Sequence, residues 1–98
     1  MVKVNICVDN ETYMRFKHMY KVSLSRFIDE FIMKHNFNIE EITMILRDIK
    51  IEHGYRKCTS VSLSHCTLYF IKLIAVKLGT NASDVILRII EYAVTHTE

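Results

Sequence analysis

The chain has 98 residues and a formal net charge of +2, from 13 lysines and arginines against 11 aspartates and glutamates. This length suits a single domain, and no apolar run approaches the roughly 20 residues that span a bilayer. The three cysteines are spaced irregularly, so neither a disulfide framework nor a zinc site is indicated. No secretory leader opens the chain, and we expect the protein to be intracellular, without membrane contact.

The first predicted element is a strand over Val2–Asp9, in which apolar and polar residues alternate with a period of two. An N-cap at Asp9 or Asn10 then begins a helix that runs to about Lys21. Ser23 caps a second helix, whose apolar residues recur at the spacing of a buried stripe. The sequence therefore predicts one strand followed by two capped helices.

Residues 36–55 have a less regular pattern. Asn38–Glu41 resembles a capping box and predicts the start of a third helix. The apolar period then changes to two at Ile49–Glu52, so a hairpin with a turn at His53–Gly54 is one interpretation. A helix that continues to a C-cap at Gly54 is the other. The sequence does not decide whether Ile49–Glu52 is strand or helix.

A second strand is predicted over Lys57–Ser64, and the residues after it repeat the earlier order of elements. An isolated strand leaves its backbone groups unpaired, and Val2–Asp9 is the one close match for a partner. Ser64 and Asn81 are N-caps of two further helices, and Gly79 between them suits a left-handed C-cap. In the new strand Thr59, Val61 and Leu63 alternate with Cys58, Ser60 and Ser62.

This duplicated order resembles the ribbon-helix-helix DNA-binding proteins, the group of the Arc and MetJ repressors. The pattern V-S-L-S-x-x-x-L-x-x-I-x-x-I-A-x-x-L-G-T-N-A-S-D-V-I, from Val61 to Ile86, is similar to that family. The first copy aligns through V-x-I-x-V-D at Val4–Asp9, and is three residues shorter between its helices. The resemblance covers everything except about residues 36–55, and the tandem form is similar to regulators of archaeal filamentous viruses.

The resemblance implies a mainly α fold with a small antiparallel β-ribbon, in which the tandem repeats form an intrachain pseudo-dimer. It divides the single domain 1–98 into a first repeat (1–35), a connecting helix with an alternative extra strand (36–55) and a second repeat (56–98). It also implies a transcription regulator that binds a double-stranded DNA operator, located in the host cytoplasm if the source is viral. Steric repression is the simplest outcome, and self-association on adjacent sites is common in the family.

A two-stranded ribbon fits the major groove and presents one face to base edges. Lys3 can donate to guanine and Asn5 can form two hydrogen bonds with adenine, whereas serines are permissive and cysteines poor readers. The alternative is that these residues form an ordinary solvated strand face. The residues expected to contact bases by this alignment are Lys3, Asn5, Cys7, Cys58, Ser60 and Ser62.

Phosphate contacts are expected where the second helix of each repeat begins, because free amides and the helix dipole favour an anion there. Plain helix capping is the alternative for the two cap residues, Ser23 and Asn81. The expected phosphate-binding residues are Ser23, Ser25, Arg26, Arg56, Lys57, Asn81 and Ser83.

A pseudo-two-fold axis at Asn5 and Ser60 would place Cys7 opposite Cys58, close enough for a disulfide. We prefer two reduced thiols, because an intracellular setting favours them. No motif indicates a nucleophile, a metal site or paired catalytic carboxylates, so we expect no enzyme, no cofactor and no small-molecule ligand. The alternative to DNA binding is a protein-interaction module, antitoxin-like or adaptor, on the same fold.

Overall fold

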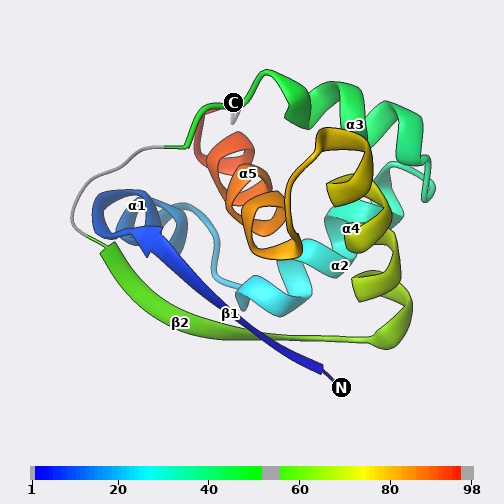
Figure 1. Cartoon of the computed structure of the whole chain (residues 1–98). Helices are drawn as coiled ribbons and strands as arrows, with labels where there is room; N and C mark the ends of the chain where they lie inside the picture. The colour runs from blue at the N-terminus through cyan, green and yellow to red at the C-terminus, as the bar shows by residue number, and fades with distance from the viewer. Residues whose placement is uncertain (1, 52–55, 96–98) are drawn as a thin grey trace.

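The computed structural model describes residues 2–51 and 56–95, and shows a mainly helical chain with one small antiparallel sheet (Figure 1). The expected fold class is thus confirmed at this level. The elements in chain order are β1 (Val2–Asp9), α1 (Asn10–Met19), α2 (Leu24–Lys34), α3 (Ile39–Arg47), β2 (Arg56–Leu63), α4 (His65–Leu78) and α5 (Ala82–Thr95).

The two strands pair with each other over their whole length, as the matching patterns predicted. Val2 lies opposite Leu63, and Asp9 lies opposite Arg56. One face of this ribbon is apolar and is covered by the helices, which all lie on the same side of it in Figure 1. Ile6, Val8, Val61 and Leu63 on this inner face are at most 3% exposed. Burial of alternate side chains therefore fixes the register of the ribbon.

Local capping explains where the helices begin. The Asp9 carboxylate accepts a hydrogen bond from the Thr12 amide at 3.1 Å, and Ser64 Oγ accepts one from the Thr67 amide at 3.2 Å. Each first helix thus begins directly after its strand. Gly79 has a φ of +71°, the left-handed conformation predicted for the C-cap of α4.

The segment after α3 differs from both interpretations of the sequence. The helix ends at Arg47, so continuation to Gly54 is wrong, and residues 49–51 belong to no strand. Arg88 of α5 explains this ending, because its Nη1 donates to the carbonyl oxygens of Leu46, Arg47 and Ile49 at 2.9–3.2 Å. The last carbonyls of a helix have no partner within it, and here the Leu46 carbonyl oxygen also accepts from the Ile49 amide at 3.2 Å. The predicted turn at His53–Gly54 lies outside the described residues.

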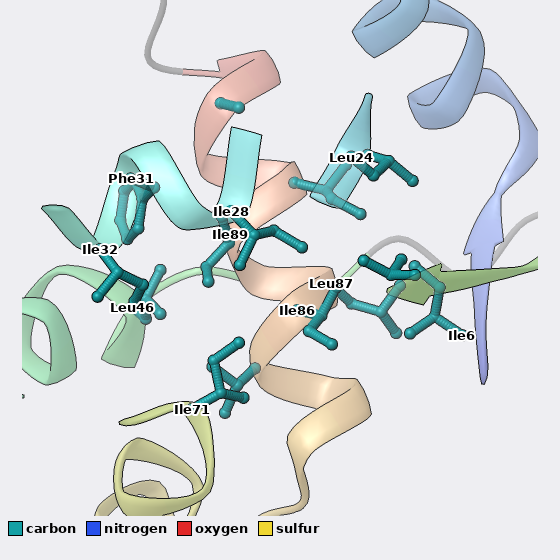
Figure 2. Packing of buried hydrophobic residues seen from close by; sticks show 14 of the residues in the cluster. Ile6, Leu24, Ile28, Phe31, Ile32, Leu46, Ile71, Ile86, Leu87 and Ile89 are labelled. Carbon is teal, nitrogen blue, oxygen red and sulfur yellow. The ribbon is translucent and has the colours of Figure 1, made fainter. Parts of the chain in front are cut away.

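Helix α5 lies at the centre of the hydrophobic core. It packs against β1, α1, α3 and α4, and α2 packs against β2. Figure 2 shows Ile86 and Ile89 of α5 among side chains from the surrounding elements. Both are fully buried, as are Ile28 of α2, Leu46 of α3 and Ile71 of α4. The apolar stripes predicted for the helices therefore converge on one core.

Polar contacts also join the two halves of the chain, the first half running from β1 to α2 and the second from β2 to α5. Thr12 Oγ1 of α1 donates to Glu91 Oε1 of α5 at 3.0 Å. In the other half, Thr67 Oγ1 of α4 donates to Asp29 Oδ1 of α2 at 2.6 Å. The third residue of each first helix thus bonds to a carboxylate on the second helix of the opposite half. Among the described residues, no helix is long and apolar enough to cross a membrane.

Candidate nucleic-acid interface

The ribbon presents a second face, opposite the inner face, that carries all six residues predicted to contact bases. We call this the outer face. Cross-strand pairing places Lys3 with Ser62, Asn5 with Ser60, and Cys7 with Cys58. Lys3, Asn5, Cys58 and Ser60 are exposed, and Cys7 and Ser62 are half-buried. The register therefore brings the six residues together on one continuous surface.

Cys7 and Cys58 form a disulfide on this face, with an S–S distance of 2.02 Å. The preference for two reduced thiols is therefore wrong. Its basis was a general rule about cellular compartments, whereas the bond follows from the strand register, which places the two Cα atoms 3.9 Å apart. Cys66, at the start of α4, is a free and exposed cysteine.

Two serines predicted to bind phosphate also connect helix N-termini to the ribbon. Ser25 Oγ of α2 accepts a hydrogen bond from the Ser62 amide of β2 at 3.0 Å. Ser83 Oγ of α5 donates to the Asn5 carbonyl of β1 at 3.1 Å. Each helix is thereby attached to the strand of the opposite half, beside a residue of the outer face. These side chains position the helix ends, and the amides of those ends remain the predicted phosphate contacts.

The capping roles of Ser23 and Asn81 are confirmed. Ser23 Oγ accepts from the Arg26 amide at 3.2 Å, and Asn81 Oδ1 accepts from the Asp84 amide at 2.9 Å. The two helix ends differ in charge, because the first turn of α5 contains Asp84 and the first turn of α2 contains no acidic residue. An anion is therefore better accommodated at the N-terminus of α2.

The basic residues predicted to contact phosphate have different surroundings. Arg26 Nε lies 3.1 Å from Glu30 Oε1, but both side chains are more than half exposed, so the ion pair is weak. Lys57 Nζ lies 4.9 Å from the centroid of the Tyr13 ring, and Lys17 Nζ lies 5.6 Å from the same centroid. Lys57 is exposed, and its strand neighbour Arg56 begins β2 with a side chain outside the described part.

The pairing of Lys17 with Lys57 was not predicted. Lys17 lies on the exposed side of α1, four residues after Tyr13, and one helical turn brings it to the same ring. The local spacing of Tyr13 and Lys17 is visible in the sequence, but Lys57 joins them only through strand pairing. Two ammonium groups on one aromatic ring form a compact positive site at the Cys7–Cys58 end of the ribbon.

The outer face can form hydrogen bonds. It offers an ammonium group, a carboxamide, two hydroxyls and a disulfide on a rigid surface. Within residues 2–51 and 56–95, no group of three metal-ligating side chains comes together. No family model, curated protein or solved structure matches this chain.

Proposed function

We propose that this protein is a sequence-specific double-stranded DNA-binding transcriptional regulator that reads the major groove with its two-stranded ribbon. The observation that carries this proposal is the outer face, where Lys3, Asn5 and Ser60 are exposed on paired strands. The major groove of B-DNA admits a two-stranded ribbon, and base edges there are distinguished by donors and acceptors of this kind. The inner face is held by the core, so recognition needs no rearrangement of the fold.

A tandem pseudo-dimer is the architecture that we propose for the chain. Aligning the repeats maps Asn5 onto Ser60, and these two residues are also cross-strand partners, as a two-fold axis between them requires. The second helix of each repeat packs on the strand of the other, α5 on β1 and α2 on β2. Thr12 and Thr67 are at equivalent positions and each bonds to a carboxylate on the second helix of the other repeat, although Glu91 lies one helical turn beyond the position equivalent to Asp29. One chain would then supply both halves of the binding unit.

Lys3 and Asn5 are the proposed base readers with the greatest discrimination. The Lys3 ammonium donates to guanine O6 and N7, and the Asn5 carboxamide can both donate to and accept from adenine. Ser60 and Ser62 contribute hydroxyls that suit several bases. The two half-sites of the operator should differ, because the two strands carry different residues at equivalent positions.

The proposed backbone contacts lie on either side of the ribbon. At the start of α2, the amides capped by Ser23 and the nearby Arg26 would hold one phosphate. Lys57 and Lys17 around Tyr13 would hold another near the opposite end of the ribbon. Phosphate contacts of this kind fix the register of the protein on the duplex and leave sequence discrimination to the outer face.

The test is selection of binding sites from random duplexes, followed by affinity measurements with Lys3→Ala and Asn5→Ala. Each substitution should weaken binding to the selected site by about 5- to 150-fold, the equivalent of 1–3 kcal/mol per bidentate contact. Lys50→Ala, which removes an exposed lysine from the segment after α3, is the charge-matched control and should leave base preference unchanged.

The salt dependence of duplex binding tests whether the protein binds DNA through phosphate contacts. Binding should weaken steeply as salt rises, because neutralising phosphates releases counterions. Undetectable or salt-insensitive duplex binding would contradict the DNA function. If Lys3→Ala and Asn5→Ala bind DNA with unchanged base preference, base recognition by the ribbon is contradicted, whereas DNA binding itself is not.

A protein-interaction module is the alternative function, and one surface favours it. Tyr69 and Val76 of α4 are 62% and 78% exposed, and they lie seven residues apart on one side of the helix. Exposed apolar side chains in such a stripe are typical of contacts with another helix. Tyr69→Ala with Val76→Ala should leave duplex binding unchanged if DNA recognition is the function of the ribbon.

A further inference from the structure

The outer face changes in chemical character along the ribbon. At one end Lys3 and Ser62 offer an ammonium and a hydroxyl, and at the centre Asn5 and Ser60 offer a carboxamide and a hydroxyl. The other end is the Cys7–Cys58 disulfide, whose Cys58 side is exposed. A disulfide has no hydrogen to donate, and its sulfurs are weak acceptors. This end of the ribbon therefore has little to offer a polar base edge.

The apolar group that base pairs display in the major groove is the C5-methyl of thymine. We propose that the Cys7–Cys58 disulfide is a specificity-determining contact that selects thymine in one half-site through this methyl group. The inference rests on the proposed function, and it assigns a role to two positions that would otherwise be poor base readers. The two sulfurs supply a soft, polarizable surface that can pack against a methyl group.

The covalent bond fixes the positions of the two sulfur atoms that would contact the methyl group. Two separate thiols could rotate and offer weak S–H donors, whereas the bond holds both sulfurs in one place between β1 and β2. Lys57 precedes Cys58, and its ammonium lies with that of Lys17 against Tyr13. Phosphate contacts at these lysines would keep this end of the ribbon in the groove, so that the disulfide reaches the base edge without a hydrogen bond of its own.

Replacing thymine with deoxyuridine removes the methyl group and leaves every hydrogen-bonding group in place. With the unreduced native protein, the replacement at one or two adjacent positions of the selected site should weaken binding about fourfold each, as expected for losing one buried methyl-sized group. Lys3→Ala should change base preference in one half-site. The thymine positions that are sensitive to deoxyuridine should lie in the other half-site. The same replacement at the other thymines of the duplex should change affinity little and is the matched DNA control.

Cys7→Ser with Cys58→Ser provides the protein control, because it replaces the disulfide with two hydroxyls. Circular dichroism establishes that the variant is folded, and the single substitution Cys58→Ser, which also removes the disulfide, is the substitute if the double serine variant does not fold. The serine variant should lose the difference between thymine and deoxyuridine and accept other bases at those positions. Titration of thiols in unreduced, denatured wild-type protein should find one free cysteine, Cys66.

Three outcomes would overturn the inference, and they can be told apart. Duplex binding that is specific but insensitive to deoxyuridine at every position overturns it and leaves the proposed function intact. Three free thiols in the unreduced protein do the same, because the disulfide would then be absent. Absence of duplex binding by the wild-type protein and by every variant overturns the proposed function, and this inference with it.

Discussion

Thr12→Val tests whether the two halves of the chain stabilise each other through buried polar contacts. The Thr12 side chain is buried in the wild-type fold, and its hydroxyl donates to Glu91 Oε1 at 3.0 Å, with Asp9 Oδ2 as a second acceptor at 3.3 Å. Glu91 is 6% exposed, so water does not readily replace the lost donor. A hydrogen bond contributes about 0.5–1.5 kcal/mol net and up to about 3 kcal/mol when one partner is charged, and we expect Thr12→Val to lower the free energy of unfolding within this range.

Urea unfolding followed by circular dichroism measures this change, with linear extrapolation to water. Thr12→Ser is the matched control, because it keeps the hydroxyl and removes one methyl group, at a cost of about 0.8 kcal/mol. In a Glu91→Gln background, Thr12→Val should cost less, since a neutral hydrogen bond contributes about 0.5–1.5 kcal/mol. Thr67→Val removes the corresponding bond to Asp29 and should have a similar effect.

A Thr12→Val variant whose free energy of unfolding lies within about 0.5 kcal/mol of wild type, the range of ordinary surface substitutions, would contradict a stabilising role of the hydroxyl. That role would also be refuted if Thr12→Ser were as destabilising as Thr12→Val, since the hydroxyl would then not be the cause. A Glu91→Gln background that leaves the cost of Thr12→Val unchanged would show that the two side chains are not coupled.

Three further predictions concern the backbone, the core and one ion pair. Gly79→Ala should lower the free energy of unfolding by about 1–2 kcal/mol because φ is +71°, and Gly79→Asn by less. Urea unfolding measures both, and equal losses would contradict a conformational cause. Ile89→Ala should cost about 2–5 kcal/mol, because Ile89 is fully buried at the centre of the core, and a loss below this range in the same assay would exclude tight packing there. Lys77 donates to Glu40 at 2.7 Å and holds the pKa of that carboxyl below its ordinary value. This ion pair stabilises the fold at neutral pH and ceases to do so as the pH falls through the folded-state pKa. Thermal unfolding of Glu40→Gln should therefore show a deficit at neutral pH that vanishes in acid, and a deficit independent of pH would contradict the assignment.

The sequence predicted the elements that depend on local chemistry. Alternation in Val2–Asp9 and Lys57–Ser64 indicated both strands, and their similarity indicated that they pair. The caps Ser23 and Asn81 were also predictable, because a cap side chain bonds to an amide three residues away. Most of the candidate site follows from these elements, since alternation alone places Lys3 and Asn5 on one face.

Contacts between distant parts of the chain were not predictable in the same way. The end of α3 at Arg47 depends on Arg88, which lies 41 residues later and bonds to the final carbonyls. The turn from α2 to α3 uses positive φ at both Asn36 and Phe37, and Phe37 has no local signal for this conformation. The Phe37 ring packs on Phe70 of α4 instead, with centroids 5.0 Å apart. The position of Cys7 opposite Cys58 was predictable from the two strands, but the disulfide between them was not, because a general rule about cellular compartments favoured thiols.

The pairing of β1 with β2 also constrains how the chain can fold. Asp9 and Arg56 are partners at one end of the ribbon and Val2 and Leu63 at the other, so every rung joins residues far apart in the sequence. Non-local pairings of this kind slow folding, because a long loop must close before contacts offset its entropy. During synthesis, the apolar face of β1 remains without its partner strand until Leu63 has left the ribosome. The ribbon that we propose as the DNA reader therefore cannot be complete until the strands of both repeats have been made.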